Sequence, residues 1–269
     1  MSDAAAASRL RVDRPHPARV YDYLLGGKDN YASDRAAAEE SLRTNPNGRV
    51  LPRVNRAFLR RVVRYLAEER GIRQFLDIGT GIPTSPNVHE VAQAAVPEAR
   101  VVYVDNDPIV LAHARALFTG TQAGRTAYID ADLRDIDAIL GAPELRDTLD
   151  LREPVGLLLF SIMHFIADEQ DPAGIVGRLL DPLPPGSYLA VSHLTGDLDP
   201  GAWQRVTDSF RERGLTMRVR SKSEIERFFA GLELLEPGVG QLQDWHPDAA
   251  DVYPPDLRTD AYGGVARKR

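Results

Sequence analysis

One short stretch of the chain places a carboxylate next to two closely spaced glycines. The residues Asp77-Ile78-Gly79-Thr80-Gly81 follow the apolar pair Phe75-Leu76. Glycine lets a backbone approach a ligand closely because it has no β-carbon. In an open parallel sheet, ligands bind at the carboxyl ends of strands, and the first turn from strand to helix is the usual place. The Gly-x-Gly pattern by itself also fits an ordinary turn.

Two further acids follow apolar runs of the same kind. Asp105 ends the run 101–104 and lies about 20 residues beyond the glycines, the offset at which an acid meets ribose hydroxyls. Asp132 follows the run 126–129, where a carboxylate can accept a hydrogen bond from an adenine amino group and the next backbone N–H, that of Leu133, can meet a ring nitrogen. Alternatively, these acids cap a turn or a helix. Together with the glycines they favour a nucleotide-derived cofactor.

The residues after the glycines distinguish two such cofactors. A dinucleotide turn has a third glycine that allows close packing beneath a pyrophosphate, but Thr84 stands at that position here, after Pro83. S-adenosylmethionine has no pyrophosphate, and it carries an ammonium group that the Asp77 carboxylate can receive. The pattern therefore favours S-adenosylmethionine over NAD.

Composition excludes several classes of function. The 269 residues are 43% hydrophobic and 27% charged, which suits one large α/β domain. A net charge of -6 argues against nucleic-acid binding. Without cysteine there is no disulfide or thiolate metal site, the histidines have no metal-binding spacing, and no apolar run approaches membrane-spanning length. We expect a cytoplasmic protein with no metal, no nucleic-acid partner and no membrane contact, and its oligomeric state is left open.

The chain divides into three parts by pattern. Residues 1–14 are predicted to be a disordered tail, 15–70 a helical N-terminal cap, and 71–269 a core of alternating strands and helices. In the cap, Val54, Phe58, Val62 and Leu66 recur at the spacing of an amphipathic helix that ends near Gly71. Strands are expected at 74–78, 100–105, 126–129, 155–161, 187–193, 216–220, 232–235 and 261–266.

The motifs at the ends of the first four strands resemble those of class I methyltransferases. The matching residues are 77–81, Asp105, Asp132-Leu133 and Phe160-Ser161. This resemblance implies a Rossmann-like α/β fold with a seven-stranded, mostly parallel sheet, helices on both faces, and S-adenosylmethionine as cofactor.

A narrower resemblance rests on the N-terminal part of the chain. Residues 18–31, ARVYDYLLGGKDNY, together with Asn55-Arg56-Ala57-Phe58, are similar to the actinobacterial S-adenosyl methyltransferase family, once catalogued as a domain of unknown function. This match spans essentially the whole chain. It names the methyl donor and leaves the acceptor open.

The residues expected to bind the cofactor come from both parts of the chain. In the N-terminal part, aromatics and glycines around residues 26–28 suit a cap over the cofactor, although a helix end with glycine as its cap is an alternative. Asn55 and Arg56 are weaker candidates on the next helix. The expected cofactor-binding residues are Asp77, Gly79, Thr80, Gly81, Asp105, Asn106, Asp132, Leu133, Phe160, Ser161, Tyr23, Gly27 and Lys28.

His164 is the candidate catalytic base. It lies in the stretch 160–169, which is similar to a Leu-His-x-x-x-Asp-Glu segment of small-molecule O-methyltransferases whose histidine removes a proton from a hydroxyl group. In-line methyl transfer requires positioning above all, and a base only when the acceptor must lose a proton. A histidine satisfied structurally at a strand end is an equal alternative, and His193 has a smaller claim.

The sequence thus predicts an S-adenosylmethionine-dependent methyltransferase that acts on an oxygen or nitrogen of a small molecule, plausibly in specialised metabolism. Two alternatives remain. The first is a non-catalytic protein that binds S-adenosylmethionine as a regulator, and the second is an NAD-dependent enzyme on a related sheet.

Overall fold

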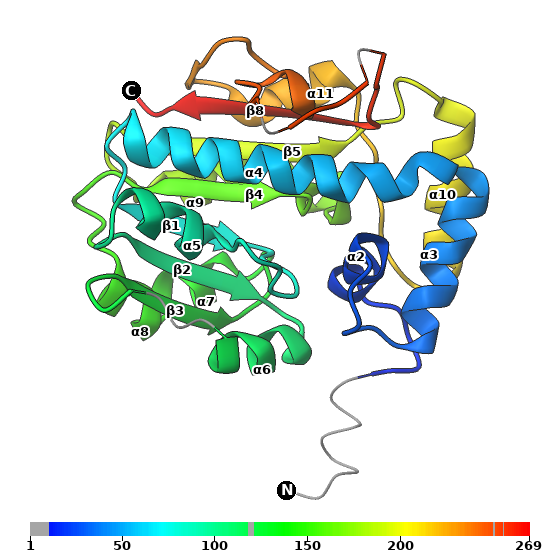
Figure 1. The fold of residues 1–269 in the computed structure, drawn as a ribbon, viewed down its shortest axis with the longest axis horizontal. Coiled ribbons are helices and arrows are strands. Elements are labelled where there is room, and N and C mark those ends of the chain that lie inside the picture. Colours follow the sequence, from blue (N-terminus) through cyan, green and yellow to red (C-terminus); the bar gives the residue numbers. More distant parts are fainter. Residues whose placement is uncertain (1–10, 118–120, 250, 255) are drawn as a thin grey trace, which may run out of the picture.

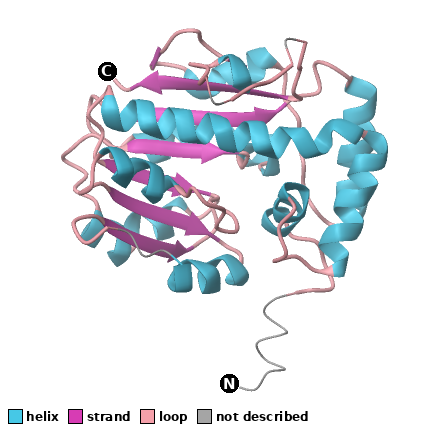
Figure 2. Ribbon diagram, viewed as in Figure 1, coloured by secondary structure: helices cyan, strands magenta, loops and turns pink. Residues whose placement is uncertain are grey.

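A central sheet lies between two layers of helices (Figures 1 and 2). The structure is a computed structural model, and it describes residues 11–117, 121–249, 251–254 and 256–269. The strands are β1 (Gln74–Ile78), β2 (Arg100–Asp105), β3 (Arg125–Asp130), β4 (Gly156–Phe160), β5 (Tyr188–Leu194), β6 (Glu233–Leu234), β7 (Gly240–Gln241) and β8 (Ala261–Arg267).

The order of the strands confirms the predicted fold class. The hydrogen-bonded path runs β3-β2-β1-β4-β5-β8-β6, with the first five strands parallel and β8 antiparallel to β5. The short strands β6 and β7 pair with successive parts of β8. The sheet is therefore Rossmann-like and mostly parallel. The strand order reverses between β1 and β4, where ligands bind in such sheets.

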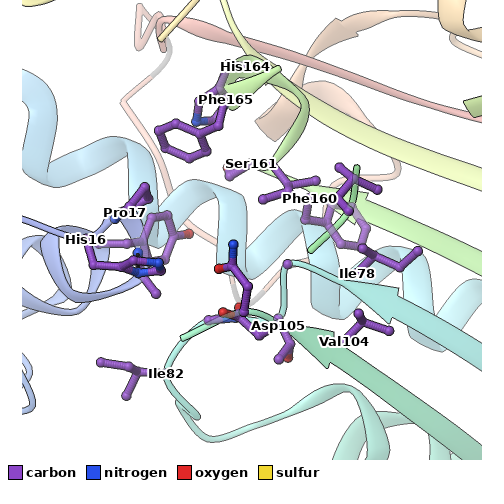
Figure 3. Close-up of a pocket in the computed structure, with 18 of the residues that line it drawn as sticks. His16, Pro17, Ile78, Ile82, Val104, Asp105, Phe160, Ser161, His164 and Phe165 are labelled. Carbon is purple, nitrogen blue, oxygen red and sulfur yellow. Dashed lines mark hydrogen bonds between the residues drawn. The ribbon is translucent and has the colours of Figure 1, made fainter. Parts of the chain in front are cut away.

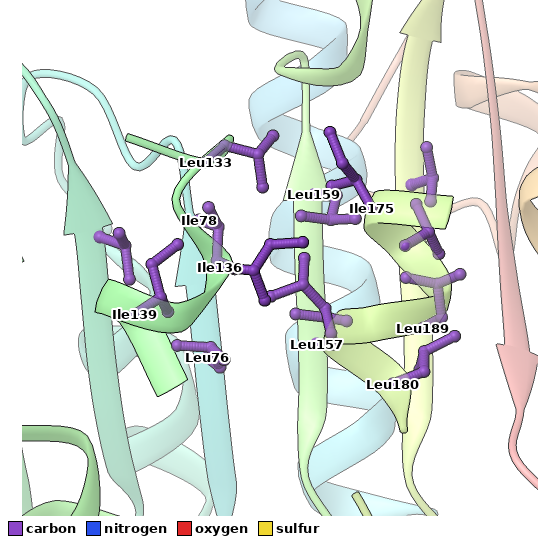
Figure 4. Close-up of a cluster of buried hydrophobic side chains, with 14 of the residues drawn as sticks. Leu76, Ile78, Leu133, Ile136, Ile139, Leu157, Leu159, Ile175, Leu180 and Leu189 are labelled. Atoms are coloured by element: carbon purple, nitrogen blue, oxygen red, sulfur yellow. The ribbon is translucent and has the colours of Figure 1, made fainter. Parts of the chain in front are cut away.

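Helices cover both faces because side chains along each strand alternate between them. Leu76 and Ile78 of β1 belong to the cluster packed by α7, α8 and α9 (Figure 4), whereas Phe75 packs on the opposite face with α4 and α5. The helices are α2 (Pro17–Leu25), α3 (Ala32–Thr44), α4 (Val50–Glu68), α5 (Val88–Ala95), α6 (Pro108–Leu117), α7 (Ile136–Gly141), α8 (Pro143–Thr148), α9 (Pro172–Leu180), α10 (Pro200–Glu212) and α11 (Lys222–Glu226).

The helix predicted from the four-residue repeat is α4, and it lies along one face of the sheet (Figure 1). Val54, Phe58, Val62 and Leu66 are all completely buried. In contrast, α2 and α3 stand beside the carboxyl ends of the parallel strands together with α10, and the three form a small apolar cluster of their own. The division into a cap at 15–70 and a core at 71–269 stays a prediction.

One expected strand is wrong. Residues Thr216–Arg220 form no ladder, because their backbone N–H groups have other partners. The N–H of Arg218 donates to the carbonyl of His164 at 2.8 Å, and that of Arg220 donates to the carbonyl of Leu194 at 3.2 Å. Together with the two residues before it, this segment forms an irregular strap, residues 214–220, that lies against the loop after β4. The short strand β7 was not expected.

The predicted tail at 1–14 lies outside the described residues except for 11–14, where the N–H of Arg14 donates to the carbonyl of Arg11. Among the described residues, none of the helices is both long enough and apolar enough to cross a membrane.

A buried ion pair fastens α2 to the sheet. The guanidinium of Arg19 donates to both carboxylate oxygens of Asp107, at 2.8 and 2.9 Å, and both side chains are almost inaccessible. Asp107 also accepts the N–H of Ile109 in the first turn of α6 at 3.0 Å. Since Asp107 follows β2 closely, this pair sets the distance between α2 and the end of that strand.

We predict that Asp107→Asn lowers the free energy of unfolding by about 3–5 kcal/mol, because it leaves the Arg19 cation buried without its carboxylate. Urea denaturation measures this loss. The matched control is Asp135→Ala, which removes a carboxylate that caps the exposed start of α7 and should cost about 1 kcal/mol. A loss at Asp107 no larger than that at Asp135 would contradict the prediction.

Candidate functional site

A pocket of about 320 Å³ opens at the carboxyl ends of β1, β2 and β4, at the reversal in strand order (Figure 3). One wall is the glycine turn with the loops after β2, β3 and β4. The facing wall comes from α2, α4 and residues 214–216 of the strap. Its volume lies in the range of small-molecule sites. Of the predicted residues, Asp77, Gly79, Thr80, Gly81, Asp105, Asn106, Asp132, Leu133, Phe160, Ser161 and His164 line it, as do Asn55 and Arg56.

Both glycines of the turn adopt backbone angles that other residues rarely take. Gly79 has φ +75° and Gly81 has φ +68°. A β-carbon at Gly79 would lie 2.6 Å from Cγ1 of Ile162, which belongs to the loop after β4. The N–H of Gly79 donates to the carbonyl of Val104 at 2.8 Å, so the turn is held against the end of β2. Glycine is therefore required by both backbone angle and close packing.

The carboxylate of Asp105 connects the turn to the end of β2. It accepts the N–H of Gly81 at 2.8 Å and the N–H of Asp107 at 3.0 Å. Burial raises the pKa of Asp105, and the two hydrogen bonds oppose this rise. Because each carboxylate oxygen has two lone pairs, the group can still accept hydrogen bonds from hydroxyls in the pocket.

Asp77 lies on the floor of the pocket, almost completely buried within β1. Burial raises its pKa to about 7, and the nearby Asp105 adds to the rise, while a hydrogen bond from Thr80 and the positive charge of Arg56 oppose it. A buried carboxylate with such a pKa is favoured in its charged form by any cation that enters the pocket. Its environment thus fits the ammonium group expected from the sequence.

Asn106 and Asp132 stand together at the ends of β2 and β3. The Asn106 amide donates to Asp132 at 2.7 Å, and the Arg134 guanidinium pairs with the same oxygen at 2.8 Å. The backbone N–H of Arg134 donates to the other oxygen of Asp132 at 2.9 Å. This arrangement holds a carboxylate at the pocket rim beside Leu133.

A buried chain of hydrogen bonds links Ser161, at the end of β4, to α2. The backbone N–H of Ser161 donates to Oγ of Ser192 at 3.0 Å, and that hydroxyl donates to Asn55 Oδ1 at 2.6 Å. The Asn55 amide donates to the hydroxyl of Tyr21 at 2.9 Å, which donates in turn to the carbonyl of Pro52 at 3.1 Å. Because the chain begins at a backbone N–H and ends at a carbonyl, the direction of every bond is fixed.

Three residues predicted to contact the cofactor lie outside the pocket lining. The Tyr23 hydroxyl bonds to Glu39 and its ring stacks on the Arg49 guanidinium, while Lys28 is exposed. Gly27 instead serves the end of α2, where a β-carbon would collide with the carboxylate of Asp22. The position of these residues does not support the contacts predicted for them.

The lining from the N-terminal part consists mostly of residues that were not predicted to bind the cofactor, namely His16, Pro17, Ala18 and Asp22. Tyr21 also lines the pocket, and it belongs to the aromatics expected to form the cap. The helical period could have shown which of these residues face the pocket, because side chains that are two positions apart on a helix point in nearly opposite directions. Tyr21 and Tyr23 of α2 therefore cannot both face the pocket. Also missed were Ile82, Ile162, Phe165 and the strap residues 214–216, which only the fold brings to this place.

His164 lies on the upper side of the pocket, next to Phe165 (Figure 3). Its side chain is buried, and burial, with the neighbouring His193 and Arg220, lowers its pKa well below the ordinary value. The base role of His164 stays a prediction. His193 is buried behind it, and the centroids of the two imidazole rings are 5.5 Å apart. Within the described part of the chain, no three acidic, histidine or cysteine side chains are grouped as metal ligands.

The chain is similar to known proteins over nearly its whole length. Residues 3–269 match a family model described as S-adenosyl methyltransferase. A solved structure from Streptomyces avermitilis, a member of a family with a domain of unknown function, is 53% identical, covers 97% of this chain and 100% of its own, and has a TM-score of 0.94. A methyltransferase-like protein from Thermobifida fusca is 42% identical over 97% of both chains, with a TM-score of 0.88.

A more distant structure shows the fold alone. The S-adenosylmethionine-dependent methyltransferase from Anabaena variabilis is 17% identical, covers 78% of this chain and 84% of its own, and has a TM-score of 0.50. No curated protein matches the chain.

The raised pKa of Asp77 predicts how stability depends on pH. Its value of about 7 exceeds the unfolded value of 3.8, so the folded protein holds the proton more tightly. The resulting stability is complete below pH 4 and is lost as the pH rises through 7. Between pH 5 and pH 8, the free energy of unfolding of the wild type should fall by roughly 3 kcal/mol more than that of Asp77→Asn, because the asparagine side chain does not titrate.

Urea denaturation of both proteins at the two pH values provides the measurement. Asp137→Asn is the control, because it removes the same charge from a side chain that is 88% exposed. Equal pH dependence in the wild type and Asp77→Asn would show that Asp77 is already ionised at low pH.

Proposed function

Because the chain belongs to the S-adenosyl methyltransferase family, we propose that it transfers the methyl group of S-adenosylmethionine to an oxygen or nitrogen of a small-molecule acceptor bound in this pocket. The observation that carries the proposal is the convergence of the glycine turn with the buried carboxylates of Asp77 and Asp105 on one cavity.

The pocket fits the chemical groups of the cofactor. Asp77 would receive the ammonium, since its raised pKa reflects a buried carboxylate that lacks enough positive charge around it. Asp105 would accept the ribose hydroxyls at the end of β2. Asp132 and the backbone of Leu133 would hold the adenine edge. When bound, the cofactor supplies a methyl group activated by a positively charged sulfur.

Most of the expected rate acceleration would come from holding the acceptor atom in line with the methyl group. Methyl transfer requires the acceptor atom to approach in line with the bond that breaks, so rigid walls contribute more than acid–base groups. The chain of hydrogen bonds from Ser161 to Tyr21 joins the two walls of the pocket through buried groups. The Arg56 guanidinium donates to the carbonyls of Thr84 and Pro86 and so fixes the loop after the glycine turn.

The kind of acceptor follows from the shape and lining of the pocket. Both α2 and the strap line the cavity opposite the strand ends and so limit its width, which suits a small molecule better than a polymer. The side chains of Tyr21, Phe165 and Leu215 supply apolar surface next to the neutral His164. A cytoplasmic location and a role in specialised metabolism remain part of this proposal.

Calorimetric titration tests the choice of cofactor. S-adenosylmethionine and S-adenosylhomocysteine are expected to bind, and NAD is not. Asp105→Ala should weaken the binding of both by about 1–3 kcal/mol, because the buried groups that hydrogen-bond to this carboxylate would be left without an acceptor. The control is Asp137→Asn, far more exposed and outside the pocket lining. Unchanged binding in Asp105→Ala would remove this residue from the cofactor site.

Transfer of a labelled methyl group distinguishes the enzyme from a regulator that only binds the cofactor. The protein would be incubated with methyl-labelled S-adenosylmethionine and small-molecule extracts of an actinobacterium. We expect labelled product and stoichiometric S-adenosylhomocysteine. Tight cofactor binding without any label transfer would favour the regulator.

A further inference from the structure

The two histidines above the pocket differ in how their ring nitrogens are occupied. In His193, Nδ1 lies 2.7 Å from the carbonyl of Leu194, and Nε2 lies 3.0 Å from the guanidinium of Arg220. A carbonyl only accepts and a guanidinium only donates. His193 is therefore neutral, with its proton on Nδ1, and burial lowers its pKa to about 3.

Arg220 fixes this arrangement from the strap side. Its side chain is 4% exposed and donates to the carbonyls of Met163 and Ile166 at 3.1 and 2.9 Å. The nitrogen that donates to Ile166 also donates to the carboxylate of Asp168 at 2.6 Å. The guanidinium thus clamps both ends of the short helix 163–165 that carries His164, and it places a permanent positive charge behind the two imidazoles.

The His164 ring has a different environment. Its Nδ1 is fully buried and has no hydrogen-bond partner among the described residues. The charged or titratable groups that act on the ring are His193 and Arg220, and both disfavour a second proton. No carboxylate is hydrogen-bonded to this ring in the part of the chain that the structure describes. A buried N–H without an acceptor is among the rarest features of native proteins.

We infer that His164 carries its single proton on Nε2 and donates this N–H to a lone pair of the methyl acceptor, so that it positions the nucleophile and does not remove its proton. This inference rests on the proposed function. It also assigns the acceptor to molecules with a hydrogen-bond-accepting oxygen or nitrogen at, or next to, the atom that is methylated.

The chemistry balances without a base on the protein. The bond from sulfur to the methyl carbon breaks with its electron pair on sulfur, and a lone pair of the acceptor forms the new bond to carbon. Any proton that the acceptor atom carried passes to water. A histidine base would need the reverse arrangement, with Nε2 unprotonated towards the acceptor and an Nδ1–H that donates to a carboxylate or a backbone carbonyl.

The tautomer can be measured directly by nuclear magnetic resonance on protein labelled with ¹⁵N-histidine, with S-adenosylhomocysteine bound. Long-range ¹H–¹⁵N correlations report which ring nitrogen carries the proton. The chain has six histidines, and the His164 ring is identified by its loss in His164→Asn or by through-bond correlation from the backbone. His193 is the matched control, since its proton should be on Nδ1.

We expect His164 to remain neutral with a protonated Nε2 from pH 6 to pH 8, and His193 to show the opposite tautomer. A proton on Nδ1 of His164, or protonation of the ring in this pH range, would overturn the inference. Neither result depends on methyl transfer. Failure of the proposed function would appear separately, as absent cofactor binding or absent label transfer.

Discussion

The end of β2 carries the hydrogen bonds on which the pocket depends. Asp105 holds the N–H groups of Gly81 and Asp107, and Asp107 in turn pairs with Arg19 of α2. Three segments far apart in the sequence are thus fixed to one another by two carboxylates separated by a single residue. If either carboxylate were absent, the glycine turn and the facing helix would lose their common support.

Burying the two carboxylates of Asp77 and Asp105 has an electrostatic cost that a positively charged ligand would offset. Asp77 and Asp105 are both buried, and each raises the free energy of the other in the charged form. Backbone N–H donors lower this cost for Asp105. For Asp77, the hydrogen bond from Thr80 and the charge of Arg56 lower it only in part, because its pKa is still raised. A cofactor that brings an ammonium group and a positively charged sulfur suits such a pocket.

The strap at 214–220 gives the pocket its second distinctive feature. Because its N–H groups bond to the loop after β4 and to the end of β5, it closes the upper wall instead of extending the sheet. Arg220, buried within this strap, donates to the carbonyl of Met163, next to His164. Burial, with a smaller contribution from Arg220, lowers the pKa of both histidines. One segment therefore both lines the pocket and affects the ionisation of His164.

Most of the strands and helices, the glycine turn and the acids at strand ends could be predicted from the sequence, although 216–220 is not a strand and β7 was not expected. These features depend on local patterns: alternation, helical period, and the need for glycine at positive φ. It also identified the family, through a long N-terminal motif. Local pattern could not show which face of α2 meets the pocket, so Tyr23 was predicted to bind the cofactor, whereas it is Tyr21 that lines the pocket.

One side of the pocket could be recognised only in the tertiary structure. Tyr21, Phe165 and Leu215 come from three distant segments, and their meeting depends on long-range packing that no spacing records. The role of His164 was likewise beyond the sequence, since a histidine's tautomer follows from the partners of its two nitrogens. The groups that act on the His164 ring, His193 and Arg220, lie 29 and 56 residues further along the chain. Local motifs therefore predicted the methyl donor, whereas packing between distant segments forms the rest of the pocket lining.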